Sequence, residues 1–510
     1  MNVMGERAVV TSHHLATKAA HEALDAGGTA VDAAVTAAAM LTVVDPRSTG
    51  VGGDLFAMVW EPGSARPVGL NAAGCAPSGM TMDALLAQGY RTMPQVGPWS
   101  VTVPGAVAGW QELLGRFGRL GLGPVLRPAE QAARSGTPVA PVVAKEWSAN
   151  VAKLARNPAA AELFLPQGKP PAVGDVWRNQ PYADLLQLLL DDGLDAFYRA
   201  PVSTALAGAV AALGGPMRPE DVESWSGTEW VDPLSVAFGP YEVFELPPPG
   251  QGLVAMIALG IYASRVAPTP VDAVHVAIES VKAGFADAAT YVADPAFAAV
   301  PLNDLLAGDR LRGLRDRFDH EPPARIHIGP PSDTVYLAVA DEQGGACSLI
   351  QSVYDGFGSA VGVSELGIVL QNRGGCFDLI EGHPNAPAPG KRPYHTIIPA
   401  MLSRQGAFAG CLGVVGGFMQ PQGHVQVLRN LVELGLEPQE AVDAPRFRVL
   451  SDGRVEFEVG YDQAVIDGLA ARGHEVGQLE EFLAGGAQLL LRTDTGVQVG
   501  SDRRKDGYAS

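Results

Sequence analysis

Residues 330–354 read PPSDTVYLAVADEQGGACSLIQSVY, and they are the most informative stretch of the chain. Two alternating apolar runs flank the turn DEQGG at residues 341–345, a pattern typical of a β-hairpin. Pro330 and Pro331 stand just before the hairpin, and proline disfavours helix and strand interiors, so an exposed connector is expected there. A β-strand does not require a proline-containing connector before it. Such a connector is expected if the first residue of the strand has to be released from the chain that precedes it.

The predicted register of this hairpin pairs two hydroxyl side chains. A symmetric antiparallel pairing about Gln343 places Ser352 directly opposite Thr334. Directly opposed side chains on one face have Cβ atoms about 5 Å apart, close enough for a hydrogen bond between hydroxyls. A slip of one residue would send one of them to the other face. Spacing alone therefore leaves an ordinary threonine at a strand start as the alternative.

Chemistry favours a functional reading of Thr334. A threonine at a new N-terminus carries a nucleophile and a base, because its hydroxyl attacks while its α-amino group, with a pKa of about 8, accepts the proton. Such an enzyme also needs an oxyanion hole. The stretch VVGGFMQPQGH offers one, since Gly416 and Gly417 follow an apolar run and precede a helix expected to begin near Gln420. A Gly-Gly pair is also common in ordinary turns.

Composition sets the broad class. The chain has 510 residues, 47% hydrophobic and 18% charged, so it is globular, with two lobes or one large α/β unit. A net charge of −19 argues against nucleic acid and anionic membranes as partners. The N-terminal stretch lacks the apolar core of a secretory signal, and no apolar run is long enough to span a bilayer. We expect a soluble, cytoplasmic protein with four free thiols.

The remaining elements follow from caps and periodicity. Residues 12–26 predict a helix closed by two glycines, and Thr29 is the expected N-cap of a second helix that ends before Asp45. The glycines at 50–53 lack phosphate-loop spacing and predict a tight turn. Residues 121–324 read as helical and loop-rich, and from Thr334 onward short β-branched runs predict strands.

Several motifs together resemble the gamma-glutamyltransferase family, whose members are self-cleaving N-terminal-nucleophile (Ntn) hydrolases. The motifs span nearly the whole chain and include DPRSTGVGGDLFAMVW, VPGAVAGW, DTVYLAVADEQGG, ELGIVLQNR, GKRPYHTIIPAM, GVVGG and GSDRRKDGYA. The resemblance implies an α/β (α+β) fold, an αββα sandwich of two stacked sheets flanked by helices. It implies cleavage between Asp333 and Thr334 into a large fragment, 1–333, and a small fragment, 334–510, which form one intertwined unit. It makes Thr334 the nucleophile, Gly416 and Gly417 the oxyanion-hole residues, and Ser352 the partner of the nucleophile.

The chain departs from the family at the expected anchors of a gamma-glutamyl group. A gapless comparison puts Met82 where the family carries the arginine that holds the α-carboxylate, and Cys376 where it carries the aspartate that holds the α-amino group. Further substrate-binding candidates replace family residues: Arg373 replaces a glutamine, Tyr354 an asparagine, and His395 and Thr396 a pair of serines.

These replacements change the charge of the expected pocket. A zwitterionic glutamyl head requires one cation and one anion, and Arg373 adds a cation, with Lys391 and Arg392 near it in the sequence. We therefore expect an amidohydrolase or acyltransferase that acts on small-molecule amides whose acyl group is anionic and lacks an α-amino group, as in oxamate-like or glutaryl-like acids. Arg373 as a solvated surface charge is the alternative reading of that residue.

Two other functions remain open at this stage: genuine gamma-glutamyl transfer or glutathione hydrolysis, and a catalytically inactive binding scaffold. No cofactor is expected. No metal site is expected either, because the histidines near the N-terminus lack acidic or thiol partners at metal spacing. The expected partners are a small-molecule amide and the two fragments of the chain as a heterodimer, without nucleic acid or membrane. A higher oligomer is left open.

Overall fold

The computed structural model describes residues 2–3, 7–265, 268–318, 326, 328–329, 332–494 and 496–510. The predicted connector residues Pro330 and Pro331 lie outside the described residues. Ser332, Asp333 and everything from there through the hairpin are described.

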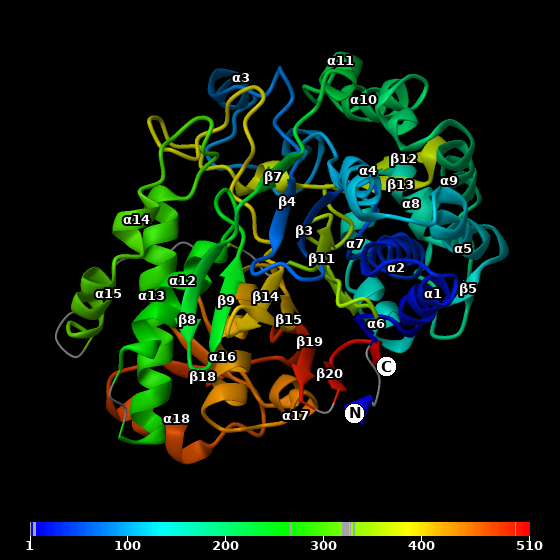
Figure 1. Ribbon diagram of the computed structural model, residues 1–510. Coiled ribbons are helices and arrows are strands. Elements are labelled where there is room, and N and C mark those ends of the chain that lie inside the picture. The colour runs from blue at the N-terminus through cyan, green and yellow to red at the C-terminus, as the bar shows by residue number, and fades with distance from the viewer. Residues whose placement is uncertain are drawn as a thin grey trace.

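Two seven-stranded sheets form the centre of the molecule (Figure 1). The first contains, in spatial order, β21 (Tyr508–Ala509), β2 (Ala8–Thr11), β10 (Val335–Ala340), β11 (Ala346–Ser352), β3 (Asp54–Trp60), β4 (Val68–Ala72) and β7 (Glu229–Val231). The second contains β1 (Asn2–Val3), β20 (Gly496–Ser501), β19 (Gly486–Thr493), β15 (Ala407–Val415), β14 (Ala400–Arg404), β9 (Tyr241–Glu245) and β8 (Leu234–Phe238). All pairings in both sheets are antiparallel.

The sheets face each other across a dry core. Alternate residues of β10 and β11 point into it, so that Tyr336, Ala338 and Ile350 pack with Phe56, and with Met401 of the facing sheet. The other residues of the same strands point outward into the helical layer. The hairpin is therefore buried on both faces, and it stands in the middle of the sandwich.

Helices cover both outer faces, which completes the predicted αββα sandwich (Figure 1). The first sheet is covered by α1 (His14–Asp25), α2 (Ala30–Val44), α4 (Ala106–Phe117), α5 (Leu122–Ser135), α9 (Gln180–Asp192) and α10 (Val202–Ala212). The second is covered by α12 (Gly252–Ala263), α13 (Pro270–Tyr291), α16 (Gln420–Val432), α17 (Pro438–Asp443) and α18 (Gln463–Ala471). Shorter helices fill the periphery: α3 (Met82–Ala87), α6 (Pro141–Ser148), α7 (Val151–Leu154), α8 (Pro158–Phe164), α11 (Pro219–Glu223), α14 (Leu302–Leu305) and α15 (Gly308–Arg315).

Short strands complete the periphery. They are β5 (Thr137–Pro138), β6 (Val176–Trp177), β12 (Val361–Val363), β13 (Ile368–Leu370), β16 (Phe447–Val449), β17 (Val455–Phe457) and β18 (Val476–Gln478).

The cap-based predictions for the first two helices are confirmed. Thr29 caps α2 through a capping box with Asp32, whose carboxylate also receives the backbone N–H groups of Arg119 and Leu120. The prediction for the middle of the chain was wrong in part. The run LSVAFGPYEVFE forms the β8–β9 hairpin. Its turn at Gly239-Pro240 is typical of a hairpin, but the segments on either side of the run are helical, and the hairpin was not predicted.

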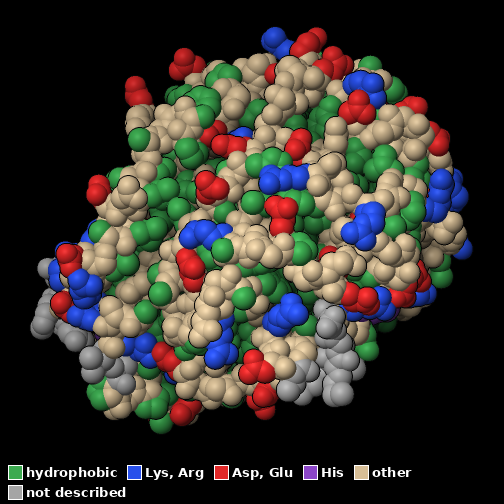
Figure 2. Space-filling view, in the orientation of Figure 1, with side chains coloured by type: hydrophobic (Ala, Val, Ile, Leu, Met, Phe, Trp, Pro, Cys, Tyr) green, Lys and Arg blue, Asp and Glu red, His purple; other side chains and the backbone are tan. Residues whose placement is uncertain are grey.

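No described helix is long and apolar enough to cross a membrane. Acidic and basic side chains are interspersed over the face of the molecule drawn in Figure 2. The predicted cytoplasmic location stays a prediction.

Candidate active site

The hairpin has the predicted register. Val335 pairs with Gln351 and the ladder continues to Ala340 and Ala346, so Thr334 lies opposite Ser352 at the open end of the hairpin. The hydroxyl oxygens of Thr334 and Ser352 are 3.1 Å apart, and both side chains are buried.

Both hydroxyls contact the carbonyl group of Asp333, the residue that precedes Thr334. Thr334 Oγ1 lies 2.5 Å and Ser352 Oγ 3.0 Å from that carbonyl oxygen, and each donates a hydrogen bond to it. The backbone N–H of Tyr354 donates to Ser352 Oγ at 2.8 Å, which fixes the serine rotamer. The hydroxyls of Thr334 and Ser352 therefore both lie against the carbonyl of Asp333.

Gly416 and Gly417 reach the same place from the facing sheet. They follow β15 and lead through a short 3-10 helix into α16, and both have positive φ, 114° and 60°, which disfavours any other residue. A Cβ atom built on Gly417 would lie 2.0 Å from Ser332 Oγ. The segment before the predicted cleavage site therefore lies directly against Gly417.

Three buried charged side chains surround the carboxylate of Asp333. Its carboxylate contacts the guanidinium of Arg47 and lies 3.3 Å from Lys505 Nζ, and Glu146 pairs with both of these cations. Burial opposes ionisation of Glu146, but Lys505 and Arg47 outweigh it and lower the pKa of that carboxyl to about 2. The sequence analysis did not foresee this cluster, because its members lie far apart in the chain.

Arg373 is fully buried, so its reading as a solvated surface charge is wrong. Its Nη1 donates to Thr396 Oγ1 at 2.8 Å, and its guanidinium carbon lies 4.4 Å above the ring of Tyr354. Its Nε and Nη2 atoms have no hydrogen-bond partner, and no carboxylate pairs with it, in the part of the chain that the structure describes. These two nitrogens form the edge of a guanidinium that binds a carboxylate with two parallel hydrogen bonds.

His395 and Thr396 take different roles. Thr396 contacts Arg373 as described, whereas His395 Nε2 lies 3.0 Å from a carboxylate oxygen of Asp54 and its ring packs on Phe56. Burial, reinforced by the charge of Arg373, lowers the pKa of His395 to about 4, so the imidazole is neutral near pH 7. Asp54 also accepts hydrogen bonds from the side chain of Gln371 and from two backbone N–H groups.

A cavity of about 280 Å³ adjoins this group. Of the predicted substrate-binding residues, Tyr354 and Cys376 line it, together with Phe418, which follows Gly417, whereas Arg373, His395 and Thr396 are not among the residues that line it. Gly329, from the segment before the cleavage site, also lines it. Burial raises the pKa of the Cys376 thiol, so that side chain is a neutral wall of the cavity.

The cavity corrects one expectation about the segment before VPG. Met82 begins α3 and is not among the residues that line the cavity, whereas Arg91, from the same segment, is exposed and does line it. Matching of residues position by position did not reveal Arg91, because it does not follow the path of the loop between Met82 and the VPG motif. A cation from this segment is therefore present after all.

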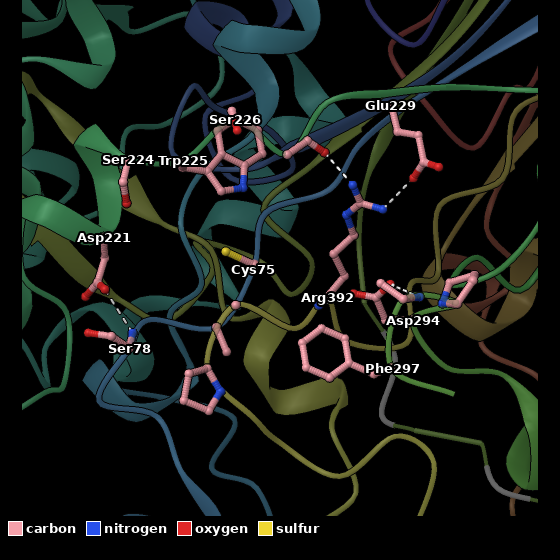
Figure 3. A pocket seen from close by; sticks show the side chains of 16 residues that line it. Cys75, Ser78, Asp221, Ser224, Trp225, Ser226, Glu229, Asp294, Phe297 and Arg392 are labelled. Carbon is pink, nitrogen blue, oxygen red and sulfur yellow. Dashed lines mark hydrogen bonds and ion pairs between the residues drawn. The ribbon is translucent and has the colours of Figure 1, made fainter. Parts of the chain in front are cut away.

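Lys391 and Arg392 do not belong to this group. Arg392 pairs with Glu229 and donates to the carbonyl of Gly227 in a different pocket of about 780 Å³, shown in Figure 3. Lys391 donates to the backbone carbonyl of Ala386 at 2.9 Å and to that of Pro384. None of the predicted site residues lines the pocket of Figure 3.

One described group has ligand types that could hold a metal ion: His275, Glu279 and His474. The ring nitrogens of the two histidines lie 2.8 Å apart, and Lys282 pairs with the carboxylate of Glu279 at 2.9 Å. The lysine ammonium already neutralises the one anion of the group. A cation would meet repulsion there.

Two stacked antiparallel sheets between layers of helices form the αββα sandwich of the Ntn hydrolases. The family model for gamma-glutamyltranspeptidase matches residues 16–510. The chain belongs to the gamma-glutamyltranspeptidase family and is an enzyme of the Ntn amidohydrolase type.

Relatives of the chain carry several names. The chain is 33% identical to the glutathione hydrolase-like YwrD proenzyme of Bacillus subtilis and 34% identical to the oxamate amidohydrolase proenzyme of Klebsiella pneumoniae, each over 100% of this chain and 99% of the relative. The crystal structure of cephalosporin acylase from Bacillus halodurans superposes with a TM-score of 0.92 at 39% identity, covering 99% of this chain and 95% of that one.

Proposed function

We propose that the protein cuts itself between Asp333 and Thr334 and then hydrolyses amides of small acids that carry a second carboxylate and no α-amino group. The observation that carries the substrate class is the buried guanidinium of Arg373, whose carboxylate-binding edge has no partner in the described structure. An unpaired buried cation costs several kcal/mol of free energy, roughly, so a ligand anion would be bound there with a large gain. The relative named for oxamate, which is the monoamide of a dicarboxylic acid, supports an acyl pocket of this kind.

Self-cleavage begins at the geometry described for Asp333. The hydroxyl oxygen of Thr334 adds to the carbonyl carbon of Asp333, the C–N bond breaks, and the hydroxyl proton is transferred to the nitrogen, which leaves an ester. Water then hydrolyses the ester, so that Asp333 ends in a carboxylate and Thr334 regains its hydroxyl next to a free amine. Ser352 polarises the carbonyl through its hydrogen bond at 3.0 Å.

The released threonine repeats this chemistry on the substrate. Its amine accepts the hydroxyl proton while the oxygen attacks the amide carbon, and the backbone N–H groups of Gly416 and Gly417 stabilise the negative oxygen. The amine then protonates the leaving nitrogen, and water releases the acid. Two observations support this arrangement: Thr334 and Ser352 pair at the open end of the hairpin, and Gly417, which follows β15 of the facing sheet, lies against Ser332.

The alternative of true gamma-glutamyl hydrolysis requires an anion for the substrate's α-amino group. The family position holds the neutral thiol of Cys376. Asp378 lines the same cavity, but its carboxylate accepts a hydrogen bond from Asn385 at 2.9 Å and lies 3.5 Å from His383. These contacts favour an acyl group without an α-amino group.

A panel of amides that differ only in the acyl group tests the substrate class. We expect kcat/KM for oxamate or glutaramate to exceed that for a gamma-glutamyl amide about tenfold or more, because the gamma-glutamyl ammonium group would lose its hydration without an anion at the position of Cys376, and an unsatisfied buried polar group costs roughly 1–3 kcal/mol. Ammonia release from each amide measures it. A gamma-glutamyl amide that surpasses both dicarboxylic monoamides would overturn the proposed substrate class and leave the nucleophile unaffected.

The pH dependence tests the base. Activity should fall as pH drops through the pKa of the released amine, because the protonated amine cannot accept the hydroxyl proton. The ordinary pKa of such an amine is about 8, and the surrounding charges shift it. The measurement is kcat/KM against pH, with the chemical step shown to limit the rate. A flat profile from mildly acidic to mildly basic pH would contradict the role of the amine.

A further inference from the structure

The four charges at the cleavage site form one closed network. Lys505 Nζ lies 3.3 and 3.4 Å from the two carboxylate oxygens of Asp333 and 2.9 Å from Glu146, while Arg47 contacts both carboxylates. All four side chains are nearly buried, with exposed fractions between 7% and 11%. Two cations and two anions make the network neutral in the uncut chain.

The network touches the reacting peptide through one oxygen. The N–H of Thr334 donates to Asp333 Oδ1 at 2.8 Å, and this oxygen is also the one 3.4 Å from Lys505 Nζ. The scissile nitrogen and the lysine cation thus share a single carboxylate oxygen. Because Arg47 and Lys505 hold that carboxylate from two sides, they also fix the direction of the Asp333 carbonyl toward the two hydroxyls.

Cleavage changes the net charge of this network. Ser332 Oγ lies 2.0 Å from the position that a Cβ of Gly417 would take, so the segment before the cut lies against this glycine. If this segment withdraws to admit a substrate oxygen to Gly417, the Asp333 carboxylate leaves with it. The network then holds two cations against the single anion of Glu146, next to the new amine of Thr334.

We propose that Arg47, Lys505 and Glu146 are positioning residues that act twice on Thr334: through Asp333 they orient the bond to be cut, and after cleavage they keep the freed amine in its neutral, proton-accepting form. This inference rests on the proposed role of Thr334 as the released nucleophile. Nearby cations disfavour protonation of an amine, and the effect is large where water is excluded.

The other charged groups around the network do not replace the lost anion. Burial raises the pKa of Asp45, although the charge of Arg47 acts in the opposite direction. Lys153 and Asp355, next to Arg47, pair with each other at 2.7 Å and add no net charge. Within the described structure, Glu146 is thus the anion that remains paired with the two cations.

The test compares Lys505→Gln with the charge-preserving Lys505→Arg in the full-length chain. We expect Lys505→Gln to slow self-cleavage about tenfold or more on a denaturing gel, and its processed fraction to show an acid limb of kcat/KM about one pH unit higher. Lys505→Arg should stay close to wild type in both measurements. Glu146→Gln removes the opposing anion, so its acid limb should move to lower pH.

Opposite shifts for Lys505→Gln and Glu146→Gln distinguish charge from general damage, because a loosened fold has no reason to move the limb in two directions. A Lys505→Gln chain that stays folded by thermal melting but never cuts would support the orienting role, with Glu146→Gln then testing the effect on the amine. Lys505→Gln and Lys505→Arg that both match wild type would overturn the inference. If the inference fails in this way while the wild-type chain still cuts itself and its kcat/KM still falls at low pH, the proposed function is unaffected.

Discussion

Thr334→Ala should leave the chain uncut and abolish activity, because one hydroxyl attacks first the carbonyl of Asp333 and later the substrate. The expected loss is the full catalytic rate. Among the described residues, Ser352 is the other hydroxyl that contacts the Asp333 carbonyl, and its oxygen accepts the N–H of Tyr354 and donates to that carbonyl. A denaturing gel should show one band of 53.1 kDa instead of two.

Thr334→Ser is the matched control for this change. It keeps the hydroxyl and loses only the methyl group, so it should cut itself and retain activity, at lower rates because the unbranched side chain is less restrained in its rotamer. Sequencing of the small fragment should begin at position 334. An alanine variant that still yields a fragment beginning there would remove Thr334 from both reactions.

Arg373→Gln should lower kcat/KM for a dicarboxylic monoamide by about ten- to a hundredfold, because a charge-assisted hydrogen bond in a desolvated site is worth roughly 1.5–3 kcal/mol. The matched substrate is the methyl ester of the distal carboxylate, which has the same amide and no charge. Its kcat/KM should change little in the variant. The quantity to compare is the ratio of kcat/KM for the acid and the ester, in wild type and variant.

Arg373→Lys separates charge from geometry in the same assay. Lysine keeps the positive charge but cannot form two parallel hydrogen bonds, so an intermediate ratio is expected. Equal losses on acid and ester in Arg373→Gln would mean that Arg373 only supports Thr396 and Tyr354, which it contacts at 2.8 Å and over the ring face. The anionic acyl group would then lose its main support.

Much of this site follows from local rules of the chain. The turn at residues 341–345 and the alternation of the flanking runs specify the pairing of Thr334 with Ser352, because a slip of one residue would turn the apolar side chains out of the core. The capping box of Thr29 and Asp32 likewise set the start of α2. These features depend on neighbours a few residues away, so they can be predicted from the sequence.

Other features required the folded chain. The β8–β9 hairpin lies within a helical region, and its place at the edge of the second sheet depends on partners in β14, far along the chain. Arg91 lines the cavity and Met82 does not, because the path of the loop, and not the order of its residues, decides which side chain reaches the cavity.

The charges around Asp333 show most clearly which features follow from the sequence and which depend on the folded chain. The sequence drew attention to Thr334, since two prolines precede a hydroxyl at a strand start, and the family resemblance implied cleavage between Asp333 and Thr334. It could not show that Arg47, Glu146 and Lys505 meet there, because they come from a loop after α2, from α6 and from the C-terminal segment. Electrostatic energy depends on distance in space and on burial, and both are known only once the sheets and helices have packed.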